Sequence, residues 1–98
     1  MPRLVSLRKS PKKGKKWEAV FDMGKGKRSR TTHFGGEGYS DYTIHKDKER
    51  RRRYRIRHSN DIVKGDPTKA GMLAFNLLWG ESTSLSKNVS SYKKKHVL

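Results

Sequence analysis

Residues 65–80, GDPTKAGMLAFNLLWG, hold a nearly continuous apolar stretch that decides the fold. Its second half leaves almost no polar face, which is typical of a buried helix. Asp66 is a suitable N-cap, Pro67 fits the first helical position, and Gly80 fits the C-terminal stop. The stretch therefore predicts a helix over residues 67–79 at the centre of the core.

The segment that follows predicts an amphipathic helix over residues 84–95, with Ser82 or Ser84 as its cap. Its apolar face recurs at helical spacing in Leu85, Val89, Tyr92 and His96. The end of this helix is basic.

The segment KDKERRRRYRIRH at residues 46–58, which precedes the apolar stretch, contains eight Lys and Arg in thirteen positions. Ser40 or Asp41 can cap a helix over residues 42–58. Asp47 and Glu49 stand four residues before Arg51 and Arg53, the favourable order for helical ion pairs. The main apolar anchors are Ile44, Tyr54 and Ile56, so most of this helix is expected to face something polar.

A β-hairpin is expected further toward the N-terminus. In WEAVFD, residues 17–22, Trp17, Ala19 and Phe21 alternate with Glu18, Val20 and Asp22, the period of a half-buried strand, and SRTTHF, residues 29–34, reads as its partner. Gly35, Gly36 and Gly38 predict a bend toward the helix. Their spacing does not match a phosphate-binding loop.

Residues 1–16 carry seven Lys and Arg and no acid, which predicts an extended basic arm over residues 1–15. Residues 16–98 then form a single α+β domain, a small β-hairpin packed on two or three helices.

The chain carries 25 Lys and Arg against nine Asp and Glu, a formal charge of +16, so its partner should be acidic. Nucleic acid, an acidic protein surface and an anionic membrane all remain open. Tyr54 is a possible stacking residue. The side chains expected to contact the partner are Arg50, Arg51, Arg52, Arg53, Arg55, Arg57, Lys12, Lys13, Lys15, Lys16, Lys93, Lys94 and Lys95.

Neither a metal site nor a catalytic site is expected. There is no cysteine, and the four histidines fit no zinc spacing. Asp41, Asp47 and Glu49 with His45 resemble a nuclease-like cluster, but a capped, ion-paired helix explains them more simply. No cofactor or small-molecule substrate is expected. No apolar run suits a membrane span or signal peptide, so a soluble, intracellular chain is expected.

Three motifs, HFGGEGYSDYTIHKDKERRRRYRIRH, DPTKAGMLAFNLLWG and SLSKNVSSYKKK, resemble a family of short basic proteins of large nucleocytoplasmic DNA viruses that infect algae and amoebae. The resemblance covers residues 16–95 and supplies no catalytic residue. It implies a virion protein made in the infected cell. The expected function is non-catalytic: a minor capsid (cement) component that docks on capsid proteins or the internal membrane, or alternatively a non-specific DNA-binding protein for genome packaging.

Overall fold

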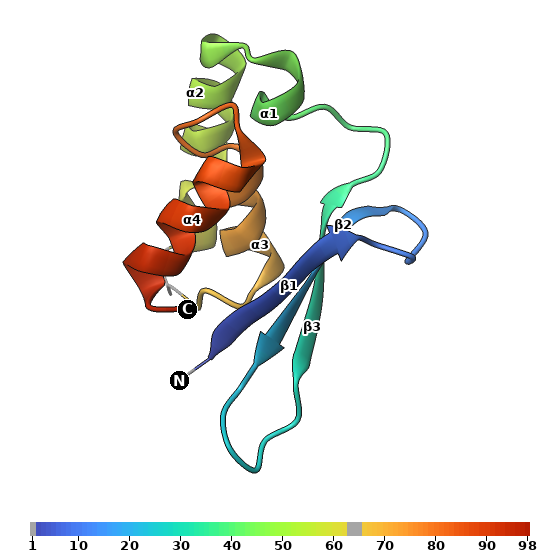
Figure 1. The fold of residues 1–98 in the computed structure, drawn as a ribbon. Coiled ribbons are helices and arrows are strands. Elements are labelled where there is room, and N and C mark those ends of the chain that lie inside the picture. Colours follow the sequence, from blue (N-terminus) through green and yellow to red (C-terminus); the bar gives the residue numbers. More distant parts are fainter. Residues whose placement is uncertain (1, 63–65) are drawn as a thin grey trace.

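The computed structural model describes residues 2–62 and 66–98 and shows a three-stranded antiparallel sheet with helices packed on one face (Figure 1). This confirms the predicted α+β class. The strands, in spatial order, are β1 (Arg3–Lys9), β2 (Lys15–Asp22) and β3 (Arg30–Gly36). The helical elements are α1 (Tyr42–His45), α2 (Lys48–Arg57), the 3-10 turn η1 (Ser59–Ile62), α3 (Ala70–Leu73), the π-helical η2 (Ala74–Leu78) and α4 (Leu85–His96).

The predicted hairpin is present as β2 and β3. Trp17 pairs with Phe34, and Ala19 pairs with Thr32. Ala19, Phe21 and Phe34 are buried, so the alternation in WEAVFD does mark the core face. Gly35 and Gly38 in the following bend have positive φ, as expected from the glycines there.

The prediction of an extended basic arm outside the domain was wrong for residues 3–9, which form the edge strand β1 of the sheet (Met1 lies outside the described residues). Leu4 is buried in the core and Leu7 packs against it. Their odd spacing breaks the period-two pattern of a strand. A register shift between Leu4 and Ser6 brings both to the core side, which is the effect of a β-bulge and hid the strand from pattern reading.

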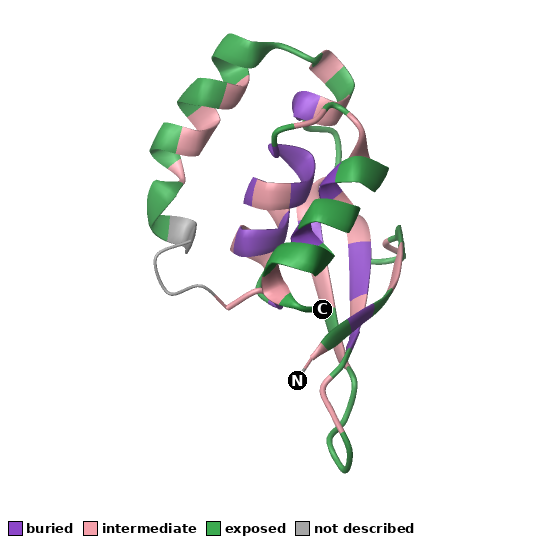
Figure 2. Ribbon diagram, turned by 60° about the vertical axis from the view of Figure 1, so that its left-hand side comes forward, coloured by how far each residue is buried: buried purple, intermediate pink, exposed green. Residues whose placement is uncertain are grey.

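The apolar stretch forms the centre of the core as predicted, but its helix begins at Ala70 rather than at residue 67 (Figure 2). Asp66 caps a turn instead, because its carboxylate accepts hydrogen bonds from the Thr68 amide and hydroxyl. The Thr68 carbonyl accepts the Thr32 hydroxyl at 2.7 Å, which ties this turn to β3. From Ala74 onward the helix widens into a π-helix, with the Trp79 amide donating to the Ala74 carbonyl.

The predicted helix over residues 42–58 is broken into α1 and α2 at Lys46, whose φ is 58°. Asp41 caps α1 as expected, whereas Asp47 caps α2 by accepting the amides of Glu49 and Arg50. The Asp47 carboxylate is therefore used at the helix start and makes no ion pair with Arg51.

The side chains of residues 42–58 also pair and pack differently from what the sequence predicts. Glu49 pairs with Arg52 rather than with Arg53, with 2.6 Å between Oε1 and Nη2. Ile44 and Ile56 are exposed and do not anchor the helix.

The predicted C-terminal helix is α4, with Ser84 as its cap. Tyr92 is buried, and its hydroxyl donates to the Pro67 carbonyl at 2.7 Å, which joins α4 to the turn before α3. Burial of the ring raises the pKa of the Tyr92 hydroxyl, so it stays a donor at all physiological pH values. No described helix is long and apolar enough to cross a membrane.

Candidate functional site

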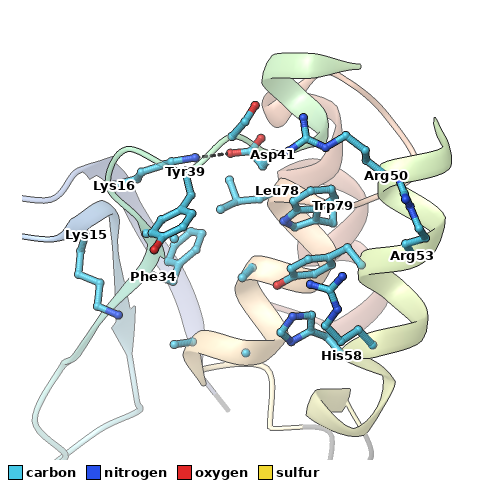
Figure 3. A pocket seen from close by; sticks show the side chains of 18 residues that line it. Lys15, Lys16, Phe34, Tyr39, Asp41, Arg50, Arg53, His58, Leu78 and Trp79 are labelled. Atoms are coloured by element: carbon cyan, nitrogen blue, oxygen red, sulfur yellow. Dashed lines mark hydrogen bonds and ion pairs between the residues drawn. The ribbon is translucent and has the colours of Figure 1, made fainter. Parts of the chain in front are cut away.

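A cleft of about 670 Å³ opens between the hairpin and α2, with α3 and η2 at its back (Figure 3). The back wall is made of small residues, Ala70, Gly71 and Ala74, which leave the space unfilled. Four aromatic residues line it as well, and the cations at its rim come from β2 and α2. The aromatic residues are Phe34, Tyr39, Tyr54 and Trp79. The cations are Lys15 and Lys16 from β2 and Arg50, Arg53 and Arg57 from α2.

The three cleft arginines, Arg50, Arg53 and Arg57, lie in one row along α2. Their i, i+3, i+7 spacing places them on a single face of the helix. All three are exposed. Within the part of the chain that the structure describes, none of their guanidinium groups has a hydrogen-bond or ion-pair partner. The row therefore presents uncompensated positive charge to whatever enters the cleft.

Arg51 and Arg55 belong to a different face of α2 and hold the helix on the core. Arg51 Nε donates to the Gly80 carbonyl at 2.6 Å, and Arg55 Nη1 donates to the Trp79 carbonyl at 2.8 Å. The Arg55 guanidinium also lies 4.1 Å from the centre of the Phe75 ring. The carbonyls at the end of a helix lack partners within the helix and carry partial negative charge, so these two arginines satisfy the end of η2.

Tyr54, the expected stacking residue, also serves this attachment. Its ring lies 4.2 Å from that of Trp79, at 5° between the planes, and 4.2 Å from that of His58. The ring therefore already has stacking partners inside the protein. Arg52, the sixth arginine expected to contact the partner, is paired with Glu49 instead.

Lys16 lies in the cleft wall, where it forms an ion pair with Asp41. Its Nζ lies 2.8 Å from Oδ2 of Asp41, and the Asp41 side chain is only 2% exposed. The same carboxylate accepts the Thr43 amide as the cap of α1. This pair ties the start of α1 to β2 on the hairpin side of the cleft.

The remaining predicted lysines lie outside the cleft. Lys12 and Lys13 are exposed in the turn between β1 and β2. Lys93, Lys94 and Lys95 are exposed at the end of α4, where the first two border a shallow hollow with Arg3, Val97 and Leu98. The structure thus divides the predicted basic residues among several surfaces.

His45 packs against Trp79, a residue of the cleft wall, with 5.1 Å between the ring centres. Its Nδ1 accepts the Asp47 amide at 2.8 Å, and its Nε2 is buried without a hydrogen-bond partner among the described residues. Burial and, next, the charge of Arg50 lower the pKa of His45 below its ordinary value of 6.5. The folded protein therefore favours the neutral ring.

This burial makes stability depend on pH. The pKa of His45 is lower in the folded chain than in the unfolded chain, so just below pH 6.5 the unfolded chain binds more protons. Acidification through that pH range therefore lowers the free energy of unfolding. His45→Asn keeps an acceptor for the Asp47 amide and removes the titration. We expect a smaller loss of thermal stability in this variant than in the unmodified protein between about pH 7.5 and 5.5. His96, whose pKa is also lowered by burial, should account for the remaining loss. Equal losses in the two proteins would contradict this role.

A Ser, His and Glu cluster on the outer face of the sheet lacks the geometry of a catalytic triad. The Ser10 hydroxyl lies 2.7 Å from His33 Nδ1, and Glu18 Oε2 lies 3.9 Å from the same nitrogen. A triad needs the nucleophile on one ring nitrogen and the carboxylate on the other. Among the side chains that the structure describes, residues 2–60 and 66–98, no three histidine or acidic groups gather as metal ligands would.

Three aromatic residues of the cleft were missed by sequence reasoning, namely Phe34, Tyr39 and Trp79. Phe34 was read only as part of the hairpin and Trp79 as part of the core helix, and both are buried while still bordering the cleft. Tyr39 stands in the glycine-rich bend GGEGY, read only as a connection, although it is 76% exposed. A large exposed aromatic residue among glycines, close to a basic run, was the available signal.

A family model described as a family of unknown function (DUF5754) matches residues 5–58. No curated protein and no solved structure matches the chain. The matched segment runs from β1 to the end of α2 and contains all five cations of the cleft, together with Tyr39 and Asp41. Because the match covers more than half of the 98 residues, the chain belongs to the DUF5754 family.

Proposed function

We propose that this protein is a non-catalytic nucleic-acid-binding protein whose cleft holds the phosphate backbone. The observation that carries the proposal is the row of Arg50, Arg53 and Arg57 beside the cleft, without internal partners in the described chain. Planar guanidinium groups bind phosphate oxygens through paired hydrogen bonds. A formal charge of +16 favours the same partner by long-range attraction.

The proposed contact gives affinity with little sequence preference. Phosphates are identical along the chain, so arginines directed at them position the nucleic acid without reading it. Arg51 and Arg55 support the site indirectly, because their bonds to the Gly80 and Trp79 carbonyls keep α2 at the rim of the cleft.

A second candidate is a minor capsid component that docks on acidic capsid proteins or on the internal membrane of a large DNA virus. It is favoured by the separation of the basic groups, since Lys93, Lys94 and Arg3 border a second hollow away from the cleft. A protein that cements two components needs two contact surfaces. Virion location and the viral setting are part of this proposal. Fractionation of virions should find the chain with emptied shells, and recovery with released DNA would count against it.

The nucleic-acid proposal is tested by measuring the affinity for labelled oligonucleotides of several unrelated sequences over a range of salt concentrations. Each neutralised phosphate contributes about −0.9 to the slope of log K against log salt for duplex DNA, and about −0.7 for single strands. With Lys15 and the three arginines engaged, we expect a slope of about −3 to −4 and similar affinities for all sequences. A flat salt dependence would overturn the proposal.

A further inference from the structure

Tyr39 is the aromatic residue of the cleft with the most accessible ring. It is 76% exposed, whereas Phe34 and Trp79 are buried and Tyr54 is stacked between protein rings. Figure 3 shows Tyr39 on the hairpin side of the cleft, next to Phe34 and across from Trp79. An exposed ring at this position is open to a ligand from solvent.

The backbone holds this ring in place. A Cβ built on Gly36 would lie 2.6 Å from Cδ2 of Tyr39, so the ring rests directly on the Gly36 backbone, and a side chain at residue 36 would displace it. The Tyr39 amide also donates to the Gly36 carbonyl at 3.2 Å, closing a tight turn. The ring is therefore positioned by its own loop and needs no packing against the core.

We infer that the cleft selects single-stranded nucleic acid, with an unpaired base stacked on Tyr39 and the flanking phosphates on Lys15 and the row of Arg50, Arg53 and Arg57. This inference rests on the proposed function and narrows its substrate class. Bases inside a duplex are stacked on each other and cannot reach a side-chain ring, whereas unpaired bases can turn out and stack on aromatic residues. The cation row spans about 10 Å of helix, enough for a short tract of backbone.

The test compares a thymidine oligomer of about 12 nucleotides, a duplex of the same length and an abasic oligomer, each with the unmodified protein, Tyr39→Ala and Tyr39→Phe. Tyr39→Ala is expected to weaken binding of the thymidine oligomer about 5- to 150-fold, as the loss of one stacked base would. Tyr39→Phe should bind like the unmodified protein because it keeps the ring. The slope with salt should be the same in all three proteins, since no charge changes.

Two controls separate this inference from the proposed function. Because Tyr39 is exposed, its substitution should leave the thermal unfolding midpoint unchanged. The affinities for the duplex and for the abasic oligomer should not respond to Tyr39→Ala. If the protein binds both the single-stranded oligomer and the duplex, and Tyr39→Ala changes neither affinity, the inference is overturned and the proposed function is left intact. Failure of the unmodified protein to bind any of the probes would overturn both.

Discussion

Replacing Asp41 with alanine is expected to lower the free energy of unfolding by about 3–5 kcal/mol, because it leaves a half-buried ammonium group without its partner. The carboxylate is 2% exposed and lies 2.8 Å from Lys16 Nζ. The Thr43 amide at the start of α1 would lose its acceptor as well. Small domains are stable by only about 5–15 kcal/mol, so the loss takes a large share of the total. Urea unfolding followed by tryptophan fluorescence measures it.

Two matched variants show which part of the interaction matters. Asp41→Asn keeps an acceptor for the Thr43 amide and removes the charge, so it should fall between alanine and the unmodified protein. Glu49→Ala removes an acid whose ion pair with Arg52 is exposed on both sides, and solvent screening makes that pair weak. A loss in Asp41→Ala no larger than that in Glu49→Ala would show that the buried pair does not hold α1 to β2.

The elements predicted correctly from the sequence are those whose pattern is local. Ser84 and the spacing from Leu85 to Tyr92 define α4, and the alternation of Trp17, Ala19 and Phe21 defines β2. The unbroken apolar run ending at Trp79 marks the core without help from the rest of the chain.

The elements that were missed depend on distant partners. β1 is a strand because it pairs with β2, and its bulge at Leu4 conceals the apolar pattern. The break at Lys46 was hidden because Asp47 suits an ion pair as well as a cap. Propensity and charge spacing cannot decide between two roles that the same carboxylate fills equally well.

The candidate site was found in part. Of the arginines at residues 50–57 that were predicted to contact a partner, Arg50, Arg53 and Arg57 line the cleft, but the division of this run into two faces could not be read from the sequence. Arg51 and Arg55 differ from Arg50 and Arg53 only because the carbonyls at the end of η2 lie beside the former pair. The position of those carbonyls is a property of the tertiary structure.

The second large effect is expected when the row of three arginines along α2 is removed. Replacing Arg50, Arg53 and Arg57 together with glutamine removes three of the proposed phosphate contacts. The slope of log K against log salt should become shallower by about 2–3, and affinity at about 0.1 M salt should fall by about two to three orders of magnitude. The fold should persist, because none of these guanidinium groups has a hydrogen-bond or ion-pair partner in the described ranges.

The matched control is the replacement of Lys93, Lys94 and Lys95 with glutamine, which also takes three charges from the formal +16. The two variants then differ in where the charge was lost and not in how much. Nucleic-acid affinity of the two, measured side by side over one salt series, is the most direct test of the cleft as the binding site. We predict a large loss and a shallower slope in the arginine variant and a small loss in the lysine variant. Equal losses in both would contradict a defined site and leave only general attraction by net charge.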